Sequence, residues 1–156
     1  SMVENWNNVV AKDAHVFHLG DVALNSPQKV LNELLFKLNG KIHLVIGNHE
    51  KDALRKAHIR ERWETIHDIS EIYVKDEEIT YGKQHIIMCH YPIAHWNASH
   101  RGSWHLFGHV HGGLSNKGQI KHHPASMDVG VDCHDFTPIS YEQVKEQITK
   151  QLLNKK

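Results

Sequence analysis

The sequence predicts an α/β fold, a sandwich built around mixed β-sheets with polar side chains at the ends of several strands. Three observations favour it: short apolar runs alternate with amphipathic helical segments, several runs end at glycine, and polar residues follow those glycines directly. At 156 residues the chain is long enough for one self-sufficient core, so we expect a single domain over residues 2–156. Ser1 before Met2 is typical of a residue left by tag removal, and we exclude it from the fold.

A helix followed by a strand–helix–strand unit is expected in the first half of the chain. The four segments are Val3–Ala11, His15–Leu19, the stretch between Ser26 and Gly40, and Lys41–Ile46. Ser26 and Pro27 are typical of a helix start, and Gly40 is typical of a helix end. The two apolar runs on either side of this helix therefore predict a parallel pair of buried strands.

The second half of the chain predicts further strands and a closing helix. The expected segments are a polar helix-compatible stretch Lys51–Arg62, weakly alternating stretches Ile69–Val74 and Glu77–Tyr81, buried strands Gln84–Cys89, His105–Phe107 and Met127–Val131, and a helix from Ser140 to about Leu153. Ser140 with Gln143 three residues later predicts a capping box at the start of that last helix.

Composition narrows the classes of function. The 18 Lys and Arg residues balance 18 Asp and Glu residues, which argues against general electrostatic attraction to nucleic acid. No apolar run approaches the roughly 20 residues that cross a bilayer, and no signal peptide is visible. Cys89 and Cys133 share no short metal-binding spacing and favour reduced thiols. We therefore expect a cytoplasmic protein without membrane or strong nucleic-acid interactions.

The 16 histidines are the unusual feature, and several stand where strands end. Asp21, Asn48, His90 and His109 each follow an apolar run closed by a glycine or a break, and His111 points the same way as His109 if the backbone is extended. Strand ends are where open α/β folds place their chemistry. A carboxylate, an amide oxygen and imidazoles suit a borderline divalent metal such as Mn, Fe or Zn.

The order of these motifs resembles that of the calcineurin-like metallophosphoesterases. The matching motifs are Gly20-Asp21, Gly47-Asn48-His49-Glu50, His90, and Gly108-His109-Val110-His111. Flanking stretches such as His18-Leu19 and Tyr91-Pro92 look like a small single-domain bacterial or phage branch of that family. The resemblance implies a sandwich of αββα layers with mixed sheets, and hydrolysis of small phosphate mono- or diesters.

The resemblance also implies roles for individual residues. The implied metal ligands are Asp21, Asn48, His90, His109 and His111, with Asp21 bridging two metals and His111 serving the second. A metal-activated hydroxide would attack phosphorus in line, and His49 would be the general acid or would stabilise the phosphoryl oxygens.

One motif of the family has no counterpart here. The family's Asp-x-His should precede Asp21 by a strand and a helix, and Asp13-Ala14-His15 lies too close to serve. We therefore expect a chain without the family's first strand, with one metal bound tightly, a second site incomplete, and weak or absent hydrolysis. The missing strand would also expose a sheet edge that invites a homodimer.

Several interpretations remain open at this point. The chain could be a catalytically weak or inactive member of the fold that serves as a protein-binding scaffold, or, with less support, a metal-storage protein. The loop residues His95, Trp96, His100 and Trp104 would either line the substrate mouth or form an ordinary loop cluster. We expect His18 to be a packed, hydrogen-bonded residue, and Glu50 to favour the start of the helix that follows it.

Overall fold

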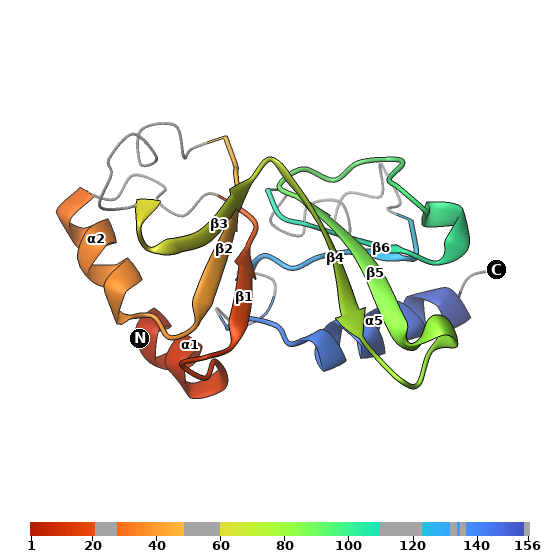
Figure 1. Cartoon of the computed structure of the whole chain (residues 1–156), viewed down its shortest axis with the longest axis horizontal. Helices are drawn as coiled ribbons and strands as arrows, with labels where there is room; N and C mark the ends of the chain where they lie inside the picture. The colour runs from red at the N-terminus through yellow and green to blue at the C-terminus, as the bar shows by residue number, and fades with distance from the viewer. Residues whose placement is uncertain (21–27, 49–59, 110–122, 132–133, 135–136, 155–156) are drawn as a thin grey trace.

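The computed structural model describes residues 1–20, 28–48, 60–109, 123–131, 134 and 137–154 (Figure 1). Its helices and strands, in order, are α1 (Met2–Val9), β1 (His15–His18), α2 (Gln28–Lys37), β2 (Lys41–Val45), β3 (Trp63–His67), β4 (Ile69–Lys75), β5 (Lys83–Cys89), β6 (Trp104–Phe107), β7 (Ser126–Asp128) and α5 (Tyr141–Leu153). The predicted α/β class is confirmed.

The strands form two sheets. One has the order β1-β2-β3 and is parallel throughout, with His15 opposite Lys41 and His18 opposite Leu44. The other has the order β4-β5-β6-β7, in which β4 runs antiparallel to β5 while β5, β6 and β7 are parallel. The expected strand–helix–strand unit is therefore confirmed, and the mixture of strand directions occurs within the second sheet.

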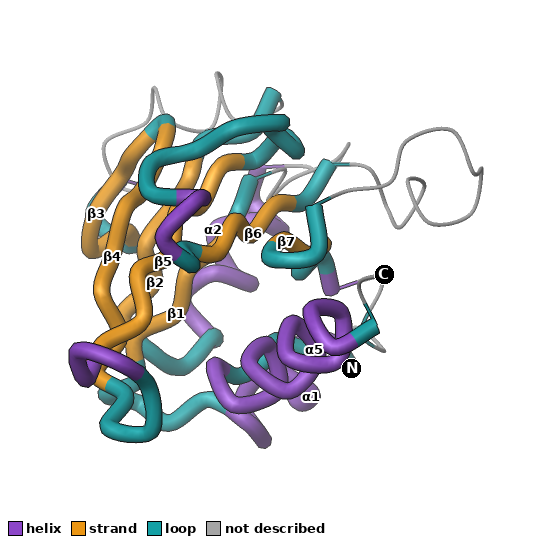
Figure 2. Tube along the Cα trace, turned by 90° about the vertical axis from the view of Figure 1, so that its right-hand side faces the viewer, coloured by secondary structure: helices purple, strands orange, loops and turns teal. Residues whose placement is uncertain are grey.

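The apolar faces of the strands define two clusters of buried side chains. Ile42 and Leu44 of β2 pack with Trp6 of α1 and Leu35 of α2. Val45 instead belongs to a larger cluster, which contains the apolar residues of β5, β6 and β7 and reaches Val144 and Ile148 of α5. Figure 1 accordingly shows α1 and α2 beside the three-stranded sheet and α5 beside the four-stranded one, and Figure 2 shows α1 and α5 on the same side of the strands.

Side-chain caps set the ends of two helices. The predicted capping box of Ser140 and Gln143 is present at the start of α5. A second capping box begins α1, where the Ser1 hydroxyl accepts from the Glu4 N–H at 3.3 Å and the terminal amino group donates to the Glu4 carboxylate at 2.7 Å. Ser1, which the sequence analysis set aside, therefore supplies the N-cap of the first helix.

Two sequence expectations in the middle of the chain need correction. Trp63–His67 forms the edge strand β3, which the sequence analysis did not predict. Glu77–Tyr81 is a turn and not a strand, because the Asp76 carboxylate accepts from the Glu78 N–H and Tyr81 adopts a left-handed φ of 68°. Most of the helix expected over Lys51–Arg62 lies outside the described residues.

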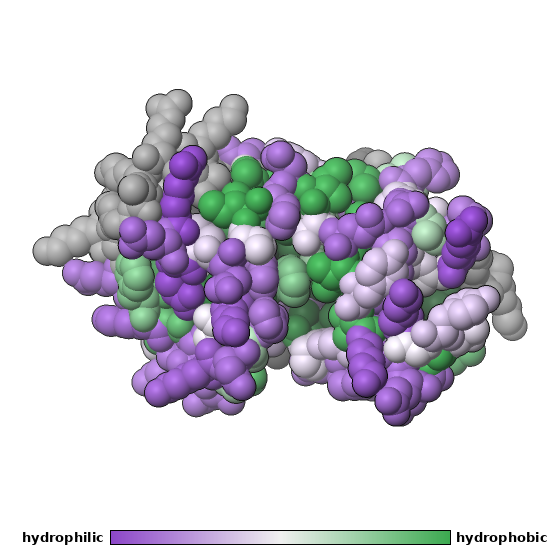
Figure 3. All heavy atoms as spheres, in the orientation of Figure 1, coloured by the Kyte–Doolittle hydropathy of each residue, from purple (hydrophilic) through white to green (hydrophobic). Residues whose placement is uncertain are grey.

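The surface in the orientation of Figure 1 is mainly hydrophilic. Figure 3 shows apolar atoms gathered near the middle of this face, where the two sheets adjoin. None of the helices that the structure describes combines the length and the apolar character needed to cross a membrane.

Candidate metal site at the strand ends

The carboxyl ends of β1, β2 and β5 meet at closely approaching backbones. Gly20 follows β1 with a left-handed φ of 94°, and a Cβ atom added to it would lie 2.6 Å from the Gly47 nitrogen and 2.7 Å from Nδ1 of His90. From the end of β6, the Gly108 N–H donates to the His90 carbonyl at 3.0 Å. Glycine is required at position 20 because any side chain would push these strand ends apart.

His90 is the buried centre of this junction, with 1% of its surface exposed. Its Nδ1 lies 2.6 Å from the carbonyl oxygen of Leu19, so Nδ1 carries the proton and donates it. Its Nε2 lies 3.0 Å from Oδ1 of Asn48 and 3.1 Å from Nδ1 of His109. Ligand-competent atoms of Asn48 and His109, which follow two other strands, therefore both lie within 3.1 Å of Nε2 of His90.

The chemistry of these three atoms fits a divalent cation. Because Nδ1–H is donated to Leu19, a neutral His90 presents the lone pair of Nε2 toward the amide oxygen of Asn48. Two electron-pair donors that face each other repel, and a cation bound between them would remove that repulsion. Metal-binding histidines commonly donate their second N–H to a carbonyl in this way. Within the described ranges no three His, Cys, Asp or Glu side chains gather, because the third donor here is an amide.

His109 brings this site to the molecular surface. It is exposed, and it holds a left-handed φ of 67°, an uncommon conformation for a residue with a side chain. Such conformations cost about 1–3 kcal/mol and concentrate at functional sites. The strained backbone after Gly108 is what turns the His109 ring toward His90.

Tyr91 is a site residue that the ligand pattern did not single out. Its ring centroid lies 4.9 Å from that of His90 and 4.8 Å from that of His109, with interplanar angles of 79° and 62°. Tyr91 is 43% exposed, so it reaches solvent while its ring contacts both imidazoles. The available signal was its position directly after His90.

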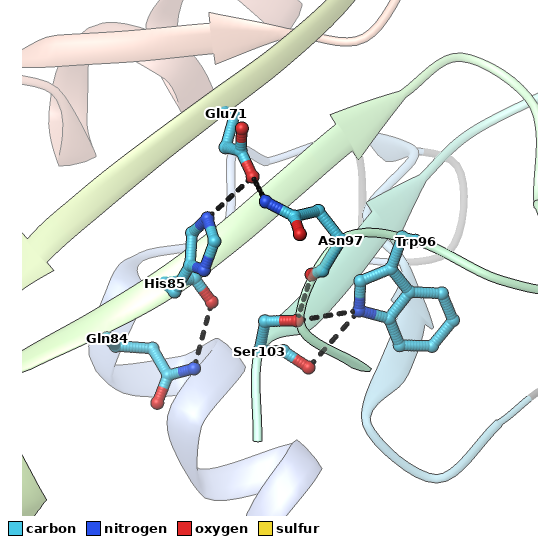
Figure 4. Close-up of polar contacts among 6 residues, drawn as sticks. All are labelled: Glu71, Gln84, His85, Trp96, Asn97 and Ser103. Carbon is cyan, nitrogen blue, oxygen red and sulfur yellow. Dashed lines mark hydrogen bonds and ion pairs between the residues drawn. The ribbon is translucent and has the colours of Figure 1, made fainter. Parts of the chain in front are cut away.

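The loop that follows Tyr91 is fixed by a polar network (Figure 4). Asn97 donates to Oε1 of Glu71 at 2.7 Å, and His85 lies 2.7 Å from the same oxygen. The Ser103 hydroxyl donates to the Asn97 carbonyl, and the Trp96 indole donates to that hydroxyl at 3.0 Å. The hydrogen bond from Asn97, with a smaller contribution from His85, holds the pKa of Glu71 below its usual value, so this exposed carboxylate stays ionised.

The network decides part of the open question about this loop. Trp96 and Trp104 are buried in the larger apolar cluster, with 7% and 6% of their surfaces exposed, so they pack the core and do not line a mouth. His95 and His100 are exposed.

His105 is a second fully buried histidine, in the middle of β6. Its Nδ1 lies 3.1 Å from the Ile87 carbonyl, and its Nε2 accepts from the Ile93 N–H at 3.1 Å. Burial lowers the pKa of His105 below 6.5, which favours the neutral ring that these two bonds require. His105 therefore anchors the start of the loop.

The structure brings together three of the six predicted site residues: Asn48, His90 and His109. The other three, Asp21, His49 and His111, lie outside the described residues, as does Glu50. His18 is half-buried; its Nδ1 accepts from the Gly20 N–H at 3.2 Å, and its ring packs edge-on against Trp63, as expected for a packed residue.

Comparisons with known proteins give relatives and a fold. No protein-family model matches this sequence. The chain is 28% identical to an uncharacterized protein of Methanocaldococcus jannaschii over 152 residues, covering 96% of this chain and 74% of that protein. It is 24% identical to the gene 66 protein of Mycobacterium phage D29 over 167 residues, covering 94% of this chain and 81% of that protein.

A solved structure shares the fold. It is the crystal structure of a protein of unknown function from Aquifex aeolicus, with a TM-score of 0.62, 21% sequence identity, and coverage of 93% of this chain and 82% of that one. At this level of identity the likeness shows the general α/β fold alone.

Proposed function

We propose that this protein is a metal-dependent phosphoesterase of the calcineurin-like type, with the αββα layers of that family, acting on small phosphate mono- or diesters. The observation that carries the proposal is the position of His90 Nε2, 3.0 Å from Oδ1 of Asn48 and 3.1 Å from Nδ1 of His109. These atoms come from separate strand ends, in the order in which the phosphoesterase motifs occur along the sequence.

The described residues have separate roles in the proposed metal binding. Asn48, His90 and His109 would hold one Mn, Fe or Zn ion, and Asp21 and His111 remain the ligands proposed from sequence. Such an ion, when bound, supplies a Lewis acid that neutralises phosphate charge and lowers the pKa of water. The Leu19 carbonyl keeps His90 in the tautomer whose Nε2 can bind the ion, and the Tyr91 ring packs edge-on against both imidazoles.

His49 remains the residue proposed to protonate the leaving group. It follows Asn48 directly in the sequence, and the family resemblance gives it the role of general acid or of stabilising the phosphoryl oxygens. Asn48 is exposed at the end of β2, which leaves this side of the site accessible to a small phosphate ester.

The test is a manganese-supplemented assay on p-nitrophenyl phosphate and bis-p-nitrophenyl phosphate. The proteins compared are the wild type, His49→Ala, His90→Ala and, as a matched control, His100→Ala, which removes an exposed loop histidine. We expect weak activity in the wild type and the control, because the second metal site is incomplete, and no activity above background in the other two. Equal background in all four proteins would reject the enzyme and favour the scaffold interpretation.

A further inference from the structure

Two histidines on neighbouring strands face each other away from the strand-end site. His15 begins β1 and His43 lies in the middle of β2, and Nδ1 of His15 is 2.9 Å from Nε2 of His43. His15 is exposed and His43 is half-buried. The pair therefore lies at the start of β1 and the middle of β2, whereas Asn48 and His90 lie beyond the carboxyl ends of β2 and β5.

The ring of His43 is held in place on two sides. Its Nδ1 lies 2.7 Å from the hydroxyl oxygen of Thr65 on β3, and the ring of Phe17 stacks on it at 4.6 Å with an interplanar angle of 14°. When Nδ1–H donates to the hydroxyl, Nε2 presents its lone pair to His15. The arrangement resembles that of His90, with one nitrogen near an oxygen and the other near an imidazole, although a hydroxyl can also donate whereas the Leu19 carbonyl only accepts.

The charge state of His43 also suits metal binding. Burial lowers its pKa below 6.5, and the charge of His15 lowers it further, with a smaller contribution of the same sign from His67 and an opposing one from Glu64.

We propose that His15 and His43 form a second, weaker binding site for an imidazole-preferring divalent cation such as Zn²⁺, Ni²⁺ or Cu²⁺. The cation replaces the hydrogen bond between the two rings, binds Nδ1 of His15 and Nε2 of His43, and completes its coordination with water. Of these three ions, Cu²⁺ should bind most tightly, and Ni²⁺ and Zn²⁺ should both bind more weakly than Cu²⁺. Binding here joins β1 to β2 and is independent of the phosphoesterase proposal.

The experiment is a Zn²⁺ titration of chelator-stripped protein by isothermal calorimetry. The proteins are the wild type, His15→Ala, His90→Ala and His100→Ala. We expect His15→Ala to weaken Zn²⁺ binding at the lower-affinity site at least about tenfold and to leave the tighter site unchanged. We expect His90→Ala to weaken the tighter site and to leave the lower-affinity site unchanged. His15 is exposed, so its replacement removes no core packing.

A second readout locates the metal directly. Substoichiometric Cu²⁺ should broaden the imidazole NMR signals of His15 and His43 in the His90→Ala protein, where the strand-end site is damaged. Identical Zn²⁺ titrations of His15→Ala and wild type, or broadening confined to other histidines, would overturn the proposal. If the wild type lacks a tight site, that result counts against the strand-end metal and not against the His15–His43 site. Failure of one proposal can therefore be distinguished from failure of the other.

Discussion

His90, directly after β5, and His105, in the neighbouring strand β6, are both almost completely buried, yet their Nε2 atoms meet different kinds of partner. His105 gives Nδ1–H to a carbonyl and receives an N–H at Nε2, so each nitrogen meets a group of complementary polarity. His90 also gives Nδ1–H to a carbonyl, but its Nε2 faces an amide oxygen and another imidazole. The first arrangement is complete as a neutral ring, whereas the second favours a cation.

The difference teaches that burial alone does not separate a structural histidine from a functional one. The chain has 16 histidines, and a ring can be buried for packing or for binding. The polarity of the groups around each nitrogen makes the distinction. The predictions below test it in order of expected effect.

The largest effect is expected from His90→Ala. Loss of an outer-sphere partner of a metal ligand costs about 10–100-fold in affinity or activity, so loss of the ligand should cost on the order of 10³-fold. Elemental analysis and kcat/KM on p-nitrophenyl phosphate measure it. A variant that keeps stoichiometric metal and wild-type activity would remove the proposed contrast with His105.

The next effect concerns stability. His105→Ala removes a buried ring and both of its hydrogen bonds, so we expect a loss of about 3 kcal/mol in the free energy of unfolding, measured in urea. Metal stoichiometry per folded molecule should stay unchanged. His100→Ala is the exposed control and should stay within about 0.5 kcal/mol of wild type.

The backbone contact at Gly20 gives an intermediate effect. Gly20→Ala should destabilise the fold by about 2–3 kcal/mol, because it adds a clash to the cost of its left-handed φ. Gly102→Ala is a matched control: its φ of 90° is close to the 94° of Gly20, but an added Cβ would meet nothing within 4 Å. Equal losses in the two variants would mean that the strand ends can separate, and metal affinity should fall with Gly20→Ala alone.

Acid should destabilise the protein through the buried rings. The folded-state pKa of His105 lies below the value of 6.5, so in the window beneath 6.5 the unfolded chain binds more protons than the folded one. Stability therefore falls as the pH drops below 6.5, by at most about 1.4 kcal/mol per pH unit for one group. His43 contributes with the same sign. Urea unfolding between pH 5 and 7 measures this slope, which His105→Gln should flatten.

The smallest effect is expected at Tyr91. Aromatic pairs contribute about 0.5–1.5 kcal/mol, so Tyr91→Ala should lower kcat/KM by roughly 2–10-fold through looser positioning of His109 and His90. Tyr91→Phe keeps the ring and should restore the wild-type value. An equal loss of kcat/KM in both variants would show that the phenolic hydroxyl of Tyr91, and not its ring contacts, supports activity.

The sequence predicted those parts of the site that local pattern controls. Apolar runs that end at a glycine or a break located three donors, Asn48, His90 and His109, which the structure brings together. The strand β3 was missed because Glu64 and Thr65 interrupt its apolar pattern, although Trp63 and Ile66 pack against the helices. The turn at Glu77–Tyr81 was missed because it depends on side-chain capping by Asp76.

Other features depend on contacts between distant segments and have no local signal. The bond between His90 and Leu19 spans 71 residues of sequence, and the pairing of His15 with His43 depends on the register of two strands. The position of Tyr91 against His109 likewise follows from the strained φ of His109.

The hydrogen bond from His90 to Leu19 has a consequence for how this site tolerates mutation. Its acceptor is a main-chain carbonyl, which every amino acid at position 19 would supply. Substitution of the Leu19 side chain therefore leaves the tautomer of His90 unchanged. A histidine whose tautomer is set by an Asp or Glu side chain would lose that control when the carboxylate is substituted. Substitutions at position 19 can alter packing while the proton stays on Nδ1 of His90. The backbone fold, and not the side chain at position 19, therefore sets which nitrogen of His90 is available as a ligand.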